Sequence, residues 1–501
     1  MKKYHFFTCS KICTLALTGA SALFLASCAK DGFDEESFDS GVSNTQVAAV
    51  DVDAITVTPS ADGKSQTISW PVVMGAGGYR VNLIDASNPS EPLINDSIVD
   101  GCSVTSKREE DTNYKVTILA LGNTKKNNTD ASESVEKTFS TFTATFATIP
   151  AGVDLKEWFE QNPTPADSVG VNLNYNLEAG AQYTLSGTLD FNVQAVTLRS
   201  NSKTNPATIN FTGEAMITFA APFNMKYMTV DCSAQDIGST NHGIFAFSKD
   251  PSAAPKGVDI DASKYKWENP LIEKPVTFVN STFKNVRSYF FWDNQQAVCA
   301  MTMLIDNCVI QLAPEKDFSG GVIWTNKGGQ VNELYVTNST FYELPDCAHD
   351  YKYFYQAGMV RGEDIYADKN AATNTVSYTN STFYHVTWNG GQWGNYNGMA
   401  GRTYSIWTMT DCIFFDCSPS GVPRRFLHGK QNQQHVTFNN NTYMKADGTF
   451  QDIKDDGTHD YDHSGTTIEE DPLFANPAAG DFHISGPTQV ARKTGDPRWL
   501  P

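Results

Sequence analysis

Apolar and polar residues alternate along the second half of the chain in a short phrase that occurs six times. The copies read VTFVNSTF (276–283), LIDNCVI (304–310), YVTNSTF (335–341), SYTNSTF (377–383), TMTDCIF (408–414) and TFNNNTY (437–443). Aligned on their central Asn or Asp, successive copies are 27, 31, 42, 31 and 29 residues apart. A strand-like unit that recurs every 20–50 residues or so predicts a stack of structural repeats.

Each copy contains one residue that interrupts the alternation. An apolar residue stands two positions before the Asn or Asp and another three positions after it, whereas an unbroken strand returns to one face every two residues. Asn and Asp tolerate the left-handed backbone conformation, so they can turn a corner between two strands. The predicted corner ladder is Asn280, Asn307, Asn338, Asn380, Asp411 and Asn440. Strand, corner, strand and return path make one coil of a right-handed parallel β-helix.

Two columns of inward side chains follow from the same alignment. The residues directly after the corners are small or polar: Ser281, Cys308, Ser339, Ser381, Cys412 and Asn441. A second, apolar column is predicted at Val286, Ala313, Leu344, Val386, Cys417 and Ala446. Three cysteines fall in these columns, and the chain has no CxxC pair, so we interpret them as buried thiols and expect no metal site.

The first 27 residues have the pattern of a cleaved export signal. Lys2 and Lys3 precede an apolar run from Leu15 to Ala26, and the run ends in Leu25-Ala26-Ser27-Cys28. This resembles a bacterial lipoprotein signal peptide, in which Cys28 becomes the acylated first residue. The run is too short to span a bilayer, so lipid is the expected membrane attachment. The acidic residues after Cys28 resemble the surface-export signal of Bacteroidota lipoproteins, although the inner leaflet remains an alternative.

Charge excludes one class of partner. The chain carries a formal net charge of −19, and loss of three lysines with the signal makes it −22. A phosphate backbone would be repelled, so we expect no nucleic-acid ligand.

Two domains are expected after a flexible tether at 28–50. Residues 51–142 show short alternating strands, and Trp70, Tyr79 and Tyr114 resemble the core tryptophan and tyrosine corner of a fibronectin type III sandwich, which is a spacer or, alternatively, a ligand contact. Residues 143–486 are assigned to the β-helix, and 487–501 to a C-terminal tail. DLKEWFEQ (154–161) predicts a short helix, capped by Asp154, that covers the first coil. The chain is therefore predicted to be all-β.

The far end of the chain carries the resemblance that covers most of it. DPLFANPAAGDFHIS (471–485) resembles the closing segment of bacterial pectate-lyase-like β-helix proteins. Together with the lipobox and the sandwich, residues 25–501 resemble Bacteroidota surface lipoproteins that are encoded with polysaccharide-uptake systems. That resemblance implies a polysaccharide or oligosaccharide ligand, location at the outer membrane facing the exterior, and possible contact with an uptake complex.

A second repeated phrase lies on the return paths. YFFWDN (289–294), GVIWTN (321–326), GMVRGE (358–363), GMAGRT (398–403) and RFLHGK (425–430) align to place Trp292, Trp324, Arg361, Gly401 and His428 in one exposed stripe. Flat aromatic faces beside cationic groups suit sugar rings, so we expect glycan contacts at Trp292, Trp324, Arg361, Arg402 and His428, and at Trp388 and Trp393 on the adjoining glycine-rich segment. The alternatives are aromatic stacking that buries area, salt bridging by Arg361 and Arg402, and a packed surface histidine.

The sequence is compatible with three functions. The first is glycan capture by a surface lipoprotein without a cofactor. The second is a polysaccharide lyase: PRRFLHG (423–429) faintly resembles the arginine region of pectate lyases, with Arg425 as the base and Ca²⁺ as a possible cofactor, although the carboxylate cluster that such lyases need is missing from the aligned coils. The third is a structural or adhesive surface protein.

Overall fold

The computed structural model describes residues 41–501 apart from 239–240, 400, 428–434 and 453–460. Its residues form two compact units, and the boundary between them in the sequence lies between Thr143 and Ala144. Both units consist mainly of strands, so the chain is all-β, as predicted. The predicted lipidation site, Cys28, lies outside the described residues. None of the described helices is both long and apolar enough to cross a bilayer.

The first unit is a sandwich of two antiparallel sheets. One sheet contains β1 (Thr56–Pro59), β2 (Ser65–Ser69) and β5 (Ser103–Lys107), and the other contains β4 (Ile94–Val99), β3 (Ala76–Asp85), β6 (Asn113–Gly122) and β7 (Val135–Ser140). A short 3-10 turn, η1 (Thr124–Lys126), follows β6. Trp70 packs edge-to-face on Tyr79 with ring centroids 5.3 Å apart, and the Tyr114 hydroxyl accepts a hydrogen bond from the Glu109 N–H at 2.8 Å. These contacts place the predicted tryptophan and tyrosine in the core.

The last part of the predicted tether is packed against this sandwich. Val47 and Val50 are buried in its core, and the Val47 N–H donates to the Thr129 carbonyl at 3.0 Å. The prediction of a flexible segment up to residue 50 is therefore wrong from Asn44 onward, since the Asn44 N–H already donates to the Lys126 carbonyl at 3.0 Å. The reason is that a few apolar residues in a polar stretch gain enough buried area once a partner strand is near.

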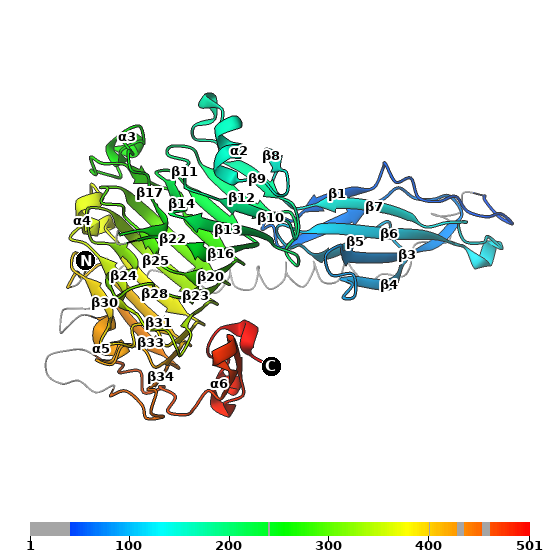
Figure 1. The fold of residues 1–501 in the computed structure, drawn as a ribbon. Coiled ribbons are helices and arrows are strands. Elements are labelled where there is room, and N and C mark those ends of the chain that lie inside the picture. The colour runs from blue at the N-terminus through cyan, green and yellow to red at the C-terminus, as the bar shows by residue number, and fades with distance from the viewer. Residues whose placement is uncertain (1–40, 239–240, 400, 428–434, 453–460) are drawn as a thin grey trace, which may run out of the picture. The chain divides into compact units, whose positions relative to one another are not determined.

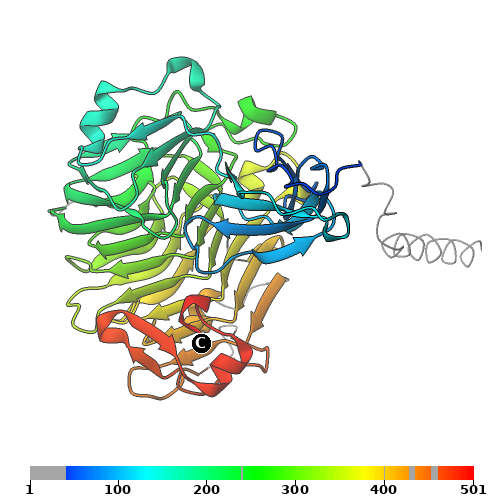
Figure 2. The same ribbon diagram turned by 90° about the vertical axis from the view of Figure 1, so that its right-hand side faces the viewer.

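The second unit is a parallel β-helix with three sheets, whose turns lie one above another (Figures 1 and 2). The nine-stranded sheet contains β10 (Gln182–Leu185), β13 (Ala207–Gly213), β16 (Met228–Gln235), β20 (Thr282–Val286), β23 (Val309–Leu312), β26 (Thr340–Glu343), β29 (Thr382–Tyr384), β32 (Ile413–Phe415) and β34 (Thr442–Met444). The seven-stranded sheet contains β11 (Thr188–Asp190), β14 (Met216–Phe219), β17 (Gly243–Phe247), β21 (Tyr289–Trp292), β24 (Phe318–Thr325), β27 (Tyr351–Ala357) and β30 (Gln392–Tyr396).

The eleven-stranded sheet completes each coil. It contains β8 (Ala147–Ile149), β9 (Leu173–Leu177), β12 (Val196–Ser200), β15 (Phe223–Lys226), β18 (Leu271–Ile272), β19 (Val276–Val279), β22 (Cys299–Asp306), β25 (Gln330–Thr337), β28 (Asn374–Thr379), β31 (Ser405–Thr410) and β33 (His435–Asn439). Every neighbouring pair within the three sheets is parallel, and parallel crossovers are almost always right-handed. The predicted right-handed parallel β-helix is the observed architecture.

The predicted corner ladder is confirmed at all six positions. The corner residues have φ between 47° and 56°, in the left-handed region, and each joins a strand of the eleven-stranded sheet to one of the nine-stranded sheet. The residues after the corners are buried and link the coils: the Ser339 Oγ accepts from the Cys308 N–H at 3.0 Å, and the Ser381 Oγ accepts from the Ser339 N–H at 3.2 Å. Small polar residues are used here because they bond the backbone of the next coil.

The second inward column is only partly as predicted. Val286, Val386 and Cys417 are buried, whereas Ala313 and Leu344 are half-buried and Ala446 is exposed. Val286 pairs with Leu312 and not with Ala313, because the register shifts after Phe283. All seven cysteines in the described residues are free thiols.

A helix covers the first coils at one end of the stack (Figure 1). In α2 (Leu155–Gln161), the Asp154 carboxylate accepts the Lys156 N–H at 2.9 Å, and Leu155 and Phe159 are buried in the core of the β-helix. The predicted cap and apolar face are both present. A 3-10 turn, η2 (Ala166–Ser168), follows.

The C-terminal segment is an integral part of the β-helix and not a tail. It contains β35 (Phe474–Asn476), η4 (Pro477–Ala479), β36 (Asp481–Ile484), α6 (Pro487–Arg492) and η5 (Pro497–Trp499). Phe482 packs on Tyr342 and Tyr384, which point outward from the nine-stranded sheet, with centroids 5.0 and 5.3 Å apart. The Trp499 Nε1 donates to the Thr340 Oγ1 at 2.8 Å. The prediction of a tail at 487–501 is wrong because Trp499 bonds Thr340 and packs on Phe482, with ring centroids 5.9 Å apart, and such long-range contacts leave no periodic pattern in the sequence of the segment.

Two insertions pack together beside the eleven-stranded sheet and form what we call the side lobe (257–271 and 360–373). It contains α3 (Gly257–Asp261), α4 (Gly362–Ile365) and η3 (Lys369–Ala371). Tyr265, Leu271 and Ile365 form a small separate core with Cys299 and Met301 of β22. A further helix, α5 (Val422–Phe426), packs against β30.

Candidate functional site

Trp292 and Trp324 are paired neighbours in the seven-stranded sheet, but the predicted stripe does not continue as expected. Trp324 pairs with Gln356, and Gln356 pairs with Asn395. Arg361 instead precedes α4 in the side lobe. The alignment failed because the tyrosine-rich segment 351–357, which none of the aligned phrases contains, is strand β27. The placement of Arg361 and Gly401 in this row is therefore wrong.

Both tryptophan side chains are covered by protein. Trp292 is 7% exposed and Trp324 is 4% exposed. The Trp324 ring lies against the Tyr289 ring, with centroids 4.7 Å apart, and directly over Gly320. A sugar ring needs an exposed aromatic face, so this row supports the alternative of stacking that buries area.

The two tryptophans of the glycine-rich segment are also committed to packing. Trp393 is fully buried and stacks on Phe354 at 4.7 Å with almost parallel rings. Trp388 is half-buried, donates from Nε1 to the Glu343 carboxylate at 3.1 Å and stacks on the His385 ring at 4.5 Å. Trp393 therefore offers no free face to a sugar ring, and His385 occupies one face of the Trp388 ring.

Two buried acids hold this part of the molecule in place. The Asp350 carboxylate accepts the N–H groups of Tyr351, Thr387 and Asn389 at 2.6, 3.0 and 2.7 Å. Burial raises the pKa of Asp350 to about 6. Burial also raises the pKa of Glu343 well above its ordinary value, and the nearby charge of Asp350 raises it further. Glu343 is 0% exposed and Asp350 is 4% exposed, so neither can act on a polymer. Their hydrogen bonds instead position the segment that carries Trp388.

Arg361 and Arg402 are brought together by one acidic residue. A guanidinium nitrogen of each lies 3.4 Å from the same Glu363 carboxylate oxygen. The Glu363 N–H in turn donates to the Tyr404 hydroxyl at 3.3 Å. This arrangement supports the salt-bridging alternative, and it anchors the Tyr404 side chain.

The residues of the lyase hypothesis are only partly described. Arg425 lies in α5 and is half-buried; burial lowers its pKa, and the neighbouring charge of Arg424 lowers it further. Its Nε has no hydrogen-bond partner among the described residues. His428 lies outside them. Within the described part of the chain, no group of three or more His, Cys, Asp or Glu side chains is placed to hold a metal ion.

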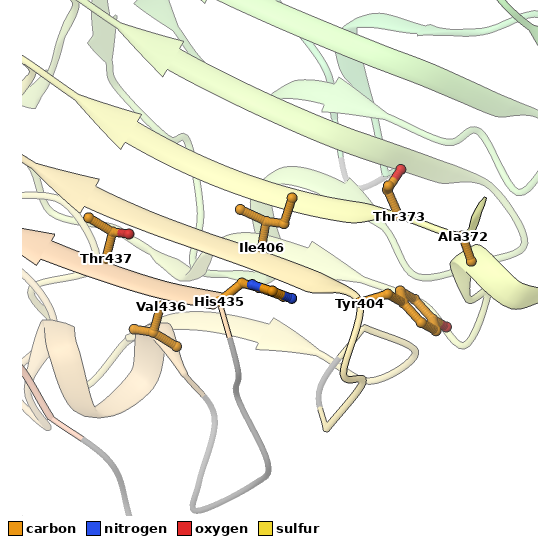
Figure 3. Close-up of a pocket in the computed structure, with 7 residues that line it drawn as sticks. All are labelled: Ala372, Thr373, Tyr404, Ile406, His435, Val436 and Thr437. Carbon is orange, nitrogen blue, oxygen red and sulfur yellow. The ribbon is translucent and has the colours of Figure 1, made fainter. Parts of the chain in front are cut away.

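An open groove lies elsewhere, on the outer face of the eleven-stranded sheet beside the side lobe. Its volume is about 590 Å³, and its lining consists of Ala372, Thr373, Tyr404, Ile406, His435, Val436 and Thr437. Figure 3 shows Ile406 and His435 on neighbouring strands, with Tyr404 and Thr373 towards the end of the groove. Ile406 is 39% exposed, so its apolar side chain is accessible from the groove. We call this site the Tyr404 groove.

A row of side chains in register continues from the groove along the eleven-stranded sheet. Glu333, Thr375, Ile406 and His435 are successive partners in β25, β28, β31 and β33. The Glu333 carboxylate accepts the Thr373 hydroxyl at 2.8 Å and, more weakly, the Thr302 hydroxyl at 3.4 Å. A parallel row of hydroxyl groups contains Tyr335, Ser377, Thr408 and Thr437. The residues that line the groove offer an aromatic ring, an apolar side chain, hydroxyl groups and an imidazole, whereas Thr375 and Ser377 in the two rows are buried (4% and 7% exposed).

Our sequence interpretation missed this row, although the corner alignment contains it. The residues that stand five positions before the corners are Thr302, Glu333, Thr375, Ile406 and His435. Because the residue two positions before each corner points inward, residues at odd offsets in the same strand point outward. This offset was not used, because the site was predicted from the aromatic phrase of the seven-stranded sheet.

The fold and the groove define a parallel β-helix protein that carries an additional β-sandwich. Three family models match the sequence: a domain of unknown function (DUF4992) matches residues 1–187, a second (DUF4957) residues 181–344 and a third (DUF5123) residues 334–499. None of them spans half of the chain. No curated protein matches the chain.

One solved structure similar to this chain is pectate lyase PelI from Erwinia chrysanthemi in complex with tetragalacturonic acid. The similarity covers 75% of this chain and 87% of that chain, with 11% sequence identity and a TM-score of 0.19. At this sequence identity and TM-score the similarity does not indicate the function of this chain.

Proposed function

We propose that this protein captures glycans in the Tyr404 groove. The observation that supports the proposal most strongly is an open groove in which the Tyr404 ring and the exposed Ile406 lie beside hydroxyl groups. Sugar rings present apolar C–H faces and hydroxyl edges, and a site with both kinds of partner matches them. Strand register fixes the floor, so little conformational entropy is lost on binding.

The proposal includes the cellular setting expected from the sequence. Cys28 carries lipid, the protein is attached to the outer membrane facing the exterior, and the sandwich, which resembles a fibronectin type III domain, acts as a spacer. A captured polysaccharide or oligosaccharide is then passed to an uptake complex in the same membrane. Incorporation of labelled palmitate that is lost in Cys28→Ala, together with protease accessibility on intact cells, tests this part.

Affinity electrophoresis of the full-length protein in gels containing plant and host polysaccharides tests glycan binding. Tyr404→Ala is expected to weaken binding about fivefold, because one sugar–aromatic contact contributes on the order of 1 kcal/mol. Tyr404→Phe keeps the ring and should bind nearly as well. Phe146→Ala is the matched control, since Phe146 is a half-exposed aromatic residue of the first coils. If no polymer retards the wild-type protein, the proposal is wrong.

A polysaccharide lyase is the second candidate, and one observation favours it. The lowered pKa of Arg425 and an Nε without a hydrogen-bond partner among the described residues are properties that an arginine base needs to remove the sugar C5 proton. Ultraviolet absorbance from an unsaturated product, lost in Arg425→Ala, would establish this activity. Binding without such absorbance supports capture alone. If neither binding nor product is seen, a structural or adhesive surface protein is the remaining function.

A further inference from the structure

We infer that Glu343 and Asp350 form a pH-sensitive switch, which holds residues 387–391 in place at acidic pH and releases them as the pH rises. We call the two side chains the buried acid pair, and residues 387–391, which lie between β29 and β30, the Trp388 segment. The inference is independent of glycan binding in the Tyr404 groove. It assigns a role to two titratable side chains that neither candidate function uses.

Three hydrogen bonds attach the Trp388 segment to the buried acid pair. The N–H groups of Thr387 and Asn389 donate to the two carboxylate oxygens of Asp350 at 3.0 and 2.7 Å. The Trp388 Nε1 donates to the Glu343 carboxylate at 3.1 Å. A change in the charge of the pair therefore acts directly on the bonds that hold this segment.

The backbone of the Trp388 segment is strained, so its conformation depends on such bonds. Thr387 has a φ of 57°, in the left-handed region, which is rare for a β-branched residue. Its buried hydroxyl has no hydrogen-bond partner among the described residues. The bond from the Ser418 hydroxyl to the Gly391 carbonyl is long, at 3.4 Å. Loss of the bonds to the acid pair would allow Thr387 to relax to an ordinary conformation.

The buried acid pair is stable only while it keeps a proton. The side chains of Glu343 and Asp350 are hydrogen-bond neighbours, and the buried Glu343 Oε1 accepts no bond from a described residue. Two ionised carboxylates only accept hydrogen bonds and repel each other, whereas a protonated Glu343 donates to its neighbour. Burial raises the pKa of Glu343 well above its ordinary value, and the charge of Asp350 raises it further, as this arrangement requires.

The side chains around the pair do not compensate two negative charges. The titratable groups that face it are Asp317, Cys347, His349, Tyr351, His385, Asp416 and Cys417. Burial raises the pKa of both thiols and of the tyrosine, so these three stay neutral at physiological pH. The two histidines are the basic side chains among them, and each lies beside an aspartate. Ionisation of both acids therefore leaves a net negative charge behind the Trp388 segment.

The direction of the switch follows from the protons that opening releases. Once the segment is open and solvated, both acids titrate near their ordinary values of about 4. In the closed state Asp350 has a pKa of about 6, and the pKa of the more deeply buried Glu343 is also raised. Between the open and closed values, opening releases a proton from each acid, so the opening constant rises by up to about tenfold per pH unit and per acid. The segment is thus closed at acidic pH and opens as the pH rises.

Hydrogen exchange of the full-length protein, measured by mass spectrometry from about pH 5 to about pH 9 and corrected for the intrinsic exchange rate, tests the switch. Protection of the Trp388 segment should fall by up to about tenfold per pH unit and should continue to fall above the pKa of Asp350. The segment should exchange faster than the core strand β25 at every pH, as local opening requires.

Glu343→Gln isolates the proton of Glu343. The glutamine keeps an acceptor for the Trp388 Nε1 and gains an NH₂ group that can donate to Asp350. Protection of the Trp388 segment should therefore level off above the pKa of Asp350 and, at the highest pH, should exceed the wild-type value about tenfold or more. Glu214→Gln removes a carboxylate from an exposed turn and should follow the wild-type profile.

Three results would overturn the inference. Protection of the Trp388 segment that does not change with pH contradicts the switch. Equal protection of the segment and of β25 at every pH means that only global unfolding responds. A wild-type profile in Glu343→Gln removes Glu343 from the mechanism. The wild-type protein alone decides the first two results, so the test does not depend on how well the variant folds.

Discussion

Two rows of side chains run across the strands of the β-helix, and they differ in what covers them. Trp292 and Trp324 in the seven-stranded sheet are almost completely buried, whereas Ile406 and His435 in the eleven-stranded sheet are exposed in an open groove. Both rows are in register from coil to coil. Register alone therefore does not make a binding platform; the exposure of the ring faces decides.

Glycines explain why the tryptophan row is closed. A Cβ at Gly320 would lie 2.7 Å from the Trp324 ring, and a Cβ at Gly243 would lie 2.8 Å from the Trp292 Cβ. Each glycine thus leaves the space into which a tryptophan packs against the sheet. No described glycine leaves such a space for Ile406, and its side chain remains exposed to solvent.

The largest expected effect is on the covered row. Trp324→Ala removes a buried aromatic side chain and should lower the free energy of unfolding by about 3–5 kcal/mol, as measured by chemical denaturation. Glycan affinity of the folded fraction should not change. A variant that loses glycan affinity without losing stability would instead make Trp324 part of the site.

The buried acids predict how stability depends on pH. A carboxyl whose pKa is raised in the folded state stabilises the fold below its unfolded pKa near 4, and this contribution is lost as the pH rises through the folded value. For Asp350, with a pKa of about 6, the loss corresponds to about 3 kcal/mol. Denaturation from pH 4.5 to 8 should show stability falling across this range.

Glu343→Gln sharpens this pH prediction. Glutamine keeps an acceptor for the Trp388 Nε1 but cannot ionise, so the variant should lose less stability than the wild type between pH 4.5 and 8. Glu214→Gln, an exposed control, should follow the wild-type curve. Equal slopes for all three proteins would show that Glu343 does not titrate in this range.

The smallest effect on stability is expected in the open row. Ile406→Thr keeps a β-branched residue in β31 and removes only partly exposed apolar surface, so the free energy of unfolding should change by less than about 0.5 kcal/mol. Glycan affinity should nevertheless fall measurably. A large loss of stability would mean that the groove is part of the core, and the contrast between the two rows would disappear.

The coil was predictable because its corner is a local property of one residue. Asn and Asp adopt positive φ at a fixed place in every repeat, and the inward side chains follow from that position. The return paths were not predictable in the same way. The longest repeat, from Asn338 to Asn380, contains strand β27 and then α4 and η3, and its sequence does not show where the extra residues leave the sheet.

The site was less predictable than the fold for a physical reason. The sequence pattern indicates which side chains point outward, and this would have included Ile406 and His435. It does not indicate which outward side chains are later covered by distant segments. Tyr342 and Tyr384 are covered by Phe482, about 100 residues or more away, whereas nothing described covers Ile406 to the same extent.

The contacts that residues 496–498 make with the middle coils have a consequence for folding during synthesis. Arg498 bonds the corner residue Asn307, 191 positions earlier, and Asp496 accepts the Thr340 hydroxyl, 156 positions earlier. These links cannot form until residues 496–498 have been synthesised, so closure of the middle coils waits for this late segment of the chain. Deletion of residues 496–499 would therefore disturb coils in the centre of the solenoid.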